Sequence, residues 1–342
     1  MPEPRKPLQT AAYVVVLVAA TWWLLGQWAN VLRPLLLAIF LAYILLPWHS
    51  RLRRAGLPAP LVILGLAGMV TVVLWSILQI AYSNTRELRD ELPVLQARFH
   101  EITQPLLQKL HHRAPWLPLP QFDGDNPLSA ELSAFGSWAV SASAGGLLEV
   151  LVAALYLLFL LLGAERLPTR VRQAYPGPAG DRILNVAGNI NAAIISYLRA
   201  KALSSLMLAL GTGLVLLAFG VKFVAIWMLL VFLCNFVPYL GSVIGYVLPT
   251  AYAALQLPPW GEPIAVAVLL LAVQVASATL IEPMFIGRAV GLSPILMLVA
   301  LAIWGTVWGL PGMILAVPLT VVLKLVLQNI DSMKPLAKLA EE

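Results

Sequence analysis

The chain has 342 residues, of which 60% are hydrophobic and 11% are charged. Soluble chains average about 25% charged residues, and no soluble core could bury the repeated long apolar runs of this sequence. We therefore predict an integral membrane protein. The net charge of +6 does not indicate a nucleic-acid partner, because Lys and Arg gather in the cytoplasmic loops of membrane proteins.

The apolar runs predict about eight transmembrane segments and no strands. The first run is interpreted as a retained span and not as a signal peptide, because further spans follow at once. The predicted segments are residues 11–29, 31–48, 60–82, 146–163, 203–219, 223–255, 263–281 and 294–328.

The predicted segments group into four parts. Residues 1–82 form the N-terminal membrane helices, 83–145 form an external arm and loop, 146–330 form the C-terminal membrane domain, and 331–342 form a tail. The fold class is therefore an all-α polytopic membrane protein with an extended external helical arm.

The charges of the loops predict which side of the membrane each loop faces. Arg51, Arg53 and Arg54 follow the second segment, and such clusters are cytoplasmic. Residues 83–145 carry five Lys/Arg against seven Asp/Glu and should be external, whereas 164–202 carry six against two and should be cytoplasmic. We expect a multi-pass protein of the bacterial inner membrane with both termini in the cytoplasm.

The external arm carries a heptad pattern of apolar residues, which predicts a helix with a packing seam. If this helix continues from Pro60, it forms one rod of roughly 50 residues that reaches about 75 Å, with kinks expected at Pro93 and Pro105. The seam needs a partner, either its own chain or a neighbouring subunit. Its members are Leu88, Leu92, Leu95, Phe99, Ile102 and Leu106, of which Leu95, Phe99 and Ile102 are the expected oligomer contacts.

The cytoplasmic segment 164–202 contains "DRILNVAGNINAAIISYLRAKALSS". Its apolar residues recur at helical spacing opposite a polar face, which predicts an amphipathic helix at the membrane surface or under the bundle.

Two apolar segments, 223–255 and 294–328, are too long for one straight crossing and are interrupted centrally, at "PYLG" and at "WGTVWGLPG". Paired Gly/Pro-interrupted segments are the best sequence indicator of a transporter binding site. Unpaired backbone at membrane depth is tolerated where it is buried in protein or lines a wet cavity. A plain proline kink is the alternative explanation.

The sequence offers no enzymatic constellation. It has no HExxH, GxSxG or P-loop motif, and each of these carries a specific catalytic or nucleotide-binding arrangement. The single cysteine, Cys234, cannot form an intrachain disulfide. We therefore predict no enzyme activity, no cofactor and no metal.

The block "NFVPYLGSVIG" together with "IEPMFIGRAVGLSPILMLVALAIWGTVWGLPGMILAVPL" resembles the AI-2E family of transporters, named for export of the quorum-sensing molecule autoinducer-2. The blocks match over residues 223–328, and the remaining spans fit more loosely. The resemblance implies an inner-membrane protein of about eight spans and a homo-oligomer, with a pentamer as one form. Family members are connected with autoinducer-2 export or with sodium/proton exchange.

The sequence departs from the family pattern at two places. Ser242 stands where proline is common after the glycine of the "PYxG" turn, and Ala200 and Lys201 stand where Gly-Gln is common. The second departure places a positive charge where an amide is usual.

The leading interpretation is a secondary transporter for a small polar solute or an ion, possessing a site built from the two interrupted segments and coupled to a proton or sodium gradient. The expected pathway residues are Asn235, Pro238, Tyr239, Gly241, Gln274, Glu282 and Arg288. The expected helix breaks are Gly245, Gly305, Gly309, Pro311 and Gly312.

Glu282 is the titratable or cation-binding candidate, with Arg288 as its expected partner; an interfacial carboxylate that marks a helix end is the alternative. A scaffold without transport and a passive channel are the competing functions. A transporter needs Asn235, Gln274 and Glu282 to face a cavity, whereas a scaffold would leave them paired with neighbouring helices. The sequence leaves open whether the two interrupted segments cross once or turn back as re-entrant hairpins.

Overall fold

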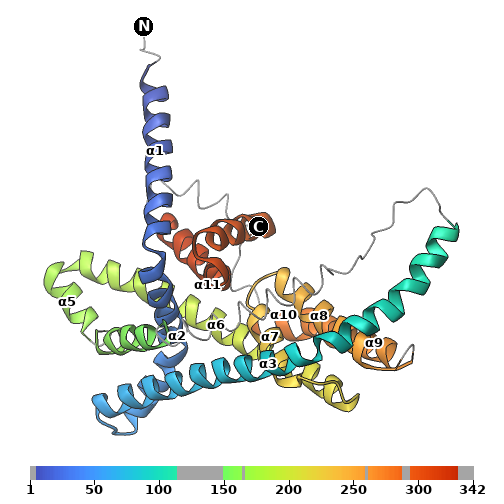
Figure 1. The fold of residues 1–342 in the computed structure, drawn as a ribbon. Helices are drawn as coiled ribbons and strands as arrows, with labels where there is room; N and C mark the ends of the chain where they lie inside the picture. The colour runs from blue at the N-terminus through green and yellow to red at the C-terminus, as the bar shows by residue number, and fades with distance from the viewer. Residues whose placement is uncertain (1–4, 114–148, 164–165, 259–260, 287–292, 330–342) are drawn as a thin grey trace. The chain divides into compact units, whose positions relative to one another are not determined.

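The computed structural model describes residues 5–113, 149–163, 166–258, 261–286 and 293–329, and the described residues form helices and the turns between them. The N-terminal helices are α1 (Arg5–Gln27), α2 (Ala29–Arg54) and α3 (Ala59–Arg113), and an unlabelled helix covers residues 149–163 (Figure 1). The later helices are α5 (Leu167–Ala174), α6 (Pro178–Ala218), α7 (Val224–Cys234), α8 (Leu240–Gln256), α9 (Gly261–Ala276), the π-helical turn η1 (Ser277–Ile281), α10 (Glu282–Ile286) and α11 (Pro294–Gln328).

The all-α polytopic fold class is confirmed. Within the described ranges, five helices are long and apolar enough to cross a membrane, or six if the bent pair Glu149–Gly163 and Leu167–Ala174 is one span. The five are Ala29–Arg54, Ala59–Ile77, Pro178–Ala218, Gly261–Phe285 and Pro311–Gln328.

Two of the described helices, α3 and α6, each run for more than 40 residues. α3 has 55 residues and passes through Pro93 and Pro105, so it is the continuous rod that the sequence suggested. α6 has 41 residues and joins the amphipathic segment to the following apolar span in one helix. The sequence predicted that a cytoplasmic segment ends at residue 202 and a membrane span begins at 203. The helix α6 continues through this boundary without a break.

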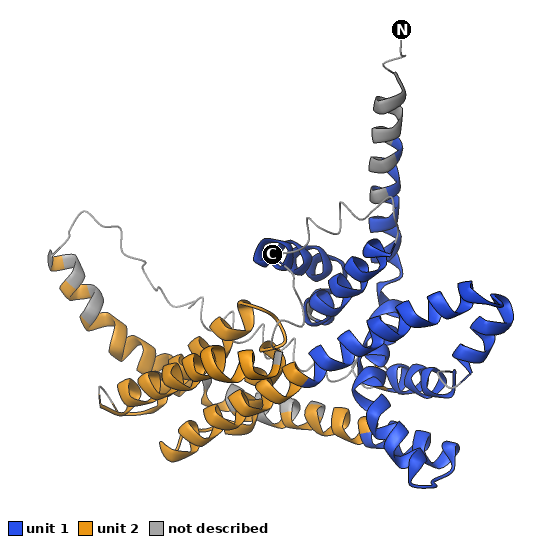
Figure 2. Cartoon of the chain, turned by 180° about the vertical axis from the view of Figure 1, so that it is seen from behind, with its two compact units in different colours: residues 1–69, 151–199, 288–342 blue, residues 70–150, 200–287 orange. Residues whose placement is uncertain are grey.

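The chain divides into two compact units (Figure 2). Unit 1 comprises residues 1–69, 151–199 and 288–342, and unit 2 comprises residues 70–150 and 200–287. The boundaries fall inside α3 and α6, so the predicted parts 1–82 and 146–330 do not coincide with the units. The interrupted segment 223–255 belongs to unit 2, and 294–328 belongs to unit 1.

The segment 223–255 is a helical hairpin in unit 2. α7 packs against α8, and both pack into cores with α6 and α9. α7 has 11 residues and is therefore about 16 Å long, roughly half the thickness of a bilayer core. Because the two helices run back along each other, the segment forms a hairpin in the fold.

The segment 294–328 also folds back, within unit 1. Leu296 and Met297 from its first half pack in one cluster with Val317 and Val321 from its second half. In a straight helix, Leu296 and Val321 would lie about 37 Å apart. The turn is at Gly309, whose φ of 65° and ψ of −142° are non-helical. The alternative of a plain proline kink is therefore wrong for this segment.

Candidate functional site

The tip of the α7–α8 hairpin is a tight turn between Cys234 and Leu240. The amide of Leu240 donates to the carbonyl of Pro238 at 2.7 Å, and Tyr239 between them has φ 63° and ψ −54°. This is the strained form of the three-residue γ-turn. Strained backbone persists only where the surrounding packing fixes it, and it clusters at functional sites.

Gly241 is required by the closeness of this turn. A Cβ atom at Gly241 would lie 1.9 Å from the carbonyl oxygen of Cys234, far inside any allowed contact. Gly245, which we expected to belong to the break, is instead inside α8. A Cβ there would meet Val231 of α7 at an ordinary 3.5 Å.

The second turn repeats this construction around Gly309. A Cβ at Gly312 would lie 2.0 Å from the carbonyl oxygen of Trp304, and one at Gly305 would lie 3.0 Å from the Met313 side chain. Pro311 begins the second half of α11, where its missing amide proton removes no helical hydrogen bond. The breaks expected at Gly309, Pro311 and Gly312 thus form one turn, with Gly305 facing it from the first half.

The side chain of Asn235 anchors the α7–α8 tip to α6. Asn235 is buried, and its Nδ2 donates to Ser205 Oγ at 2.9 Å. Ser205 is itself fully buried. Asn235 therefore pairs with a neighbouring helix in this structure and does not face open space.

Glu282 pairs with Lys201 of α6. The ammonium of Lys201 donates to Oε1 of Glu282, and the exposed fractions of the two side chains are 8% and 31%. Glu282 begins α10, directly after the π-helical turn η1, and such π-bulges recur at functional sites. The partner expected for Glu282, Arg288, lies outside the described residues.

Lys201 and Ser205 lie four residues apart on α6, so they lie on the same face of that helix. Asn235 and Glu282 consequently contact adjacent positions of α6. The tip of the hairpin and the α9–α10 junction thus meet one polar face of α6, which also carries Ser204, whose hydroxyl donates to the carbonyl of Lys201 at 3.0 Å. Gln274 of α9 is half-buried, and Tyr239 is exposed.

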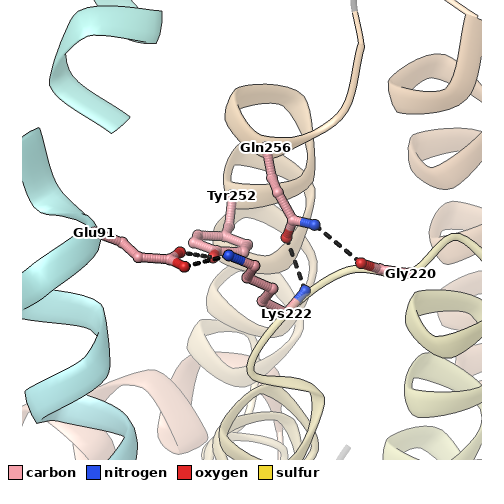
Figure 3. A network of polar contacts seen from close by, with 5 residues as sticks. All are labelled: Glu91, Gly220, Lys222, Tyr252 and Gln256. Atoms are coloured by element: carbon pink, nitrogen blue, oxygen red, sulfur yellow. Dashed lines mark hydrogen bonds and ion pairs between the residues drawn. The ribbon is translucent and has the colours of Figure 1, made fainter. Parts of the chain in front are cut away.

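The open end of the hairpin is closed by a second polar cluster, which joins Glu91, Gly220, Lys222, Tyr252 and Gln256 (Figure 3). Oε1 of Gln256 accepts from the amide of Lys222 at 2.7 Å, and its Nε2 donates to the carbonyl of Gly220 at 2.9 Å. These bonds join the residues before α7 to the end of α8. The start and the end of the hairpin therefore lie next to each other.

Glu91 of α3 connects the arm to this closed end. Its carboxylate accepts from the ammonium of Lys222 and from the hydroxyl of Tyr252, the latter at 3.2 Å. One turn further along α3, Leu95 is 5% exposed and packs in a core cluster with Tyr252 and Leu257 of unit 2. For Leu95, the packing partner is therefore its own chain; Phe99 and Ile102 are half-buried, and their contact with another subunit stays a prediction.

Sequence reasoning identified Asn235 and Glu282 but missed their partners. In the sequence, Lys201 stands out only as a departure from the family pattern, and its spacing from Glu282 does not indicate that the two residues pair. The available signal was a charge of each sign at the end of an otherwise apolar run, because ionisable groups in membrane segments pair with one another. Ser205 and the cluster around Glu91 gave no comparable signal.

Comparison with known proteins shows the family of this chain. The sequence model described as AI-2E family transporter matches residues 12–332. The chain belongs to the AI-2E transporter family. It is therefore a multi-pass membrane transport protein and not an enzyme.

Named relatives of the AI-2E family cover nearly the whole chain. The Escherichia coli K12 protein named "Putative transport protein YhhT" is 29% identical over 334 residues, which cover 95% of this chain and 92% of that protein. The "AI-2 transport protein TqsA" of the same organism is 28% identical, over 88% of this chain and 86% of that protein. The "Putative permease PerM" of Escherichia coli K12 is 26% identical, over 93% of this chain and 92% of that protein.

Proposed function

We propose that this AI-2E family protein is a secondary transporter for a small polar solute or an ion, which it exports or exchanges across the bacterial inner membrane. The observation that carries the proposal is the Lys201–Glu282 pair at the tip of the re-entrant hairpin. An ion pair within apolar helices costs desolvation free energy, so a membrane protein retains one where it serves a purpose.

The geometry supports a site at one end of the membrane. Ser205 lies 13 residues before Ala218, the last residue of α6, so the hairpin tip and its closed end are separated by about 20 Å along α6. Glu282 lies 21 residues after Gly261, a helical rise of about 32 Å, which is one bilayer core. The tip and the ion pair therefore lie together on the opposite side of the hairpin from Glu91 and Lys222.

The loop charges assign these faces. The arm that carries Glu91 is external by charge count, so the hairpin enters from outside and its tip approaches the cytoplasmic side. In this scheme Lys201, near the end of segment 164–202, lies toward the cytoplasm, which agrees with the positive charge of that segment. In this scheme both termini are cytoplasmic, and the loop with Arg288 is cytoplasmic too.

We infer that the structure represents a closed state of the site. Asn235 and Glu282 both pair with residues of α6. A scaffold without transport would show the same pairing. For transport, the hairpin tip must move so that a solute or cation replaces Ser205 and Lys201 as the partner of these two groups. A cation at Glu282 would compete directly with the Lys201 ammonium.

The test is flux in liposomes over a panel of small polar solutes, Na⁺ and protons, with and without a proton gradient. We expect gradient-driven flux with the wild type, its loss with Glu282→Gln, and partial flux with Glu282→Asp. The matched control is Glu262→Gln, in the exposed first turn of α9, which should transport normally. Wild-type flux by the Glu282→Gln variant at both acid and neutral pH would show that this carboxylate only closes a helix end.

The scaffold alternative is tested by the same preparation. If the wild type moves no member of the panel in either direction, while it retains its mass and helicity, transport by this chain is contradicted. A passive channel would instead give flux that needs no gradient of a second solute and that Glu282→Gln does not abolish.

A further inference from the structure

Unit 1 contains a cavity of about 360 Å³. It opens to the surface and is lined by the end of α2, the helix over residues 149–163 and α6. Its apolar wall is formed by Leu46, Leu161 and Ile195, and its polar wall by His49, Ser50 and Arg199. The volume is at the lower end of the range of small-ligand sites, about 300–1,000 Å³.

The polar wall of the cavity is suited to an anion. Arg199 is exposed, and no ion pair joins its guanidinium to any residue in the described part of the chain. The hydroxyl of Ser50 already donates to the carbonyl of Pro47 at 3.0 Å. Arg199 is therefore the residue of this wall that would bind an anion. The described lining holds no carboxylate. A guanidinium presents two parallel donors, which match phosphate oxygens.

The surroundings of the cavity place it at the level of the lipid headgroups. Trp48 is 57% exposed beside the cavity, and the guanidinium of Arg51 lies 5.9 Å from the centre of its ring. Trp and Arg at the end of an apolar helix mark the membrane interface. The last turn of α2 carries Arg51, Arg53 and Arg54, and basic clusters of this kind attract anionic lipids on the cytoplasmic side.

We propose that this cavity binds the phosphate of an anionic phospholipid, with Arg199 as the charged contact. Free phosphate would satisfy the same guanidinium, but it would leave the wall of Leu46, Leu161 and Ile195 uncovered. A phospholipid places its glycerol and first methylene groups against that wall, so both halves of the cavity are used. This site does not depend on the transport mechanism proposed above.

The test is thermal unfolding of the purified, delipidated full chain in mild detergent, with phosphatidylglycerol, phosphatidylcholine or inorganic phosphate added. Phosphatidylglycerol should raise the unfolding temperature of the wild type and should not raise that of Arg199→Gln. The matched control is Arg170→Gln on α5, which removes an exposed arginine outside the cavity and should keep the full response.

A second variant, Ile195→Trp, fills the cavity without changing the charge and should also lose the response. Native mass spectrometry of retained phosphatidylglycerol should follow the same order, with fewer bound lipids in both cavity variants. An equal rise for wild type and both cavity variants would overturn the proposal. So would a full rise with inorganic phosphate alone, which would identify a free-anion site.

Discussion

Lys201 and Glu282 are separated by 81 residues in the sequence and form an ion pair in the fold. Each lies at one end of an apolar run whose side chains cannot solvate a charge. The two residues therefore stabilise each other's charge. The side chain of Lys201 is nearly buried, whereas Glu282 retains some contact with the surroundings. The pair is therefore asymmetric, and Glu282 is the member that an incoming cation can reach.

Removing one member of this pair should destabilise the protein more than removing both. We expect Lys201→Met or Glu282→Gln alone to lower the free energy of unfolding by about 1–3 kcal/mol. This is less than the loss of about 3–5 kcal/mol when one partner of a fully buried ion pair is removed, because Glu282 is partly exposed. The double variant should lose less than either single variant. Denaturant unfolding in detergent measures the cycle, and simple additivity would contradict a direct interaction.

The sequence could reveal Glu282 as a candidate because an acidic residue at the end of an apolar run is rare in membrane proteins. It could not reveal Lys201 as its partner, because that requires knowing that α6 and α10 bring these two run ends to the same face. Ser205 was less visible still, since a serine within an apolar helix usually bonds its own backbone.

At the scale of elements, the two interrupted segments are hairpins whose turns depend on glycines, Gly241 in the first and Gly309 with Gly312 in the second. Proline and glycine in the middle of an overlong run were enough to predict both interruptions. They were not enough to predict that the chain turns back, because a kinked crossing has the same composition. That distinction rests on contacts such as Gln256 with Gly220, which join residues 36 apart.

Gly241 and Gly245 provide a matched pair for testing the hairpin turn. Gly241→Ala should prevent the tight turn, because its Cβ would overlap the carbonyl oxygen of Cys234. Gly245→Ala should be tolerated, with a change of at most about 1 kcal/mol in the free energy of unfolding. Thermal unfolding in detergent measures both variants; equal behaviour of the two would contradict the turn described here.

The arm α3 offers a second matched pair, one residue apart. Leu95 is 5% exposed in the core of unit 2, whereas its neighbour Val94 is 63% exposed. Leu95→Ala should lower the free energy of unfolding by about 2–4 kcal/mol, and Val94→Ala should change it little. Neither should alter the oligomeric mass. A mass change with Leu95→Ala would show that this leucine contacts another subunit.

At the scale of the whole molecule, the remaining residues of the arm are the candidates for assembly. Phe99 and Ile102 continue the seam beyond Leu95 and are half-buried within one chain. Replacing both with serine should lower the mass of the detergent-solubilised protein, measured by light scattering, while its helicity stays unchanged. An unchanged mass would mean that the whole seam packs within its own chain.

The membrane topology has a direct test at Ser293, the N-cap of α11. If both interrupted segments are re-entrant, the loop before Ser293 is cytoplasmic; if each crosses once, it is external. We expect Ser293→Cys, in a Cys234→Ala background, to react with a membrane-impermeant thiol reagent in inverted vesicles and not in intact cells. Labelling in intact cells would refute the re-entrant arrangement.

The closed end of the α7–α8 hairpin has a consequence for the order of folding. Its own contacts join residues close in sequence, so the hairpin closes a short loop at small entropic cost and can form during membrane insertion. The contact of Glu91 with Lys222 spans 131 residues and must await the synthesis of everything between them. The arm therefore docks late, and a nascent chain arrested before Lys222 would carry it undocked, exposing Leu95 to chaperones and proteases.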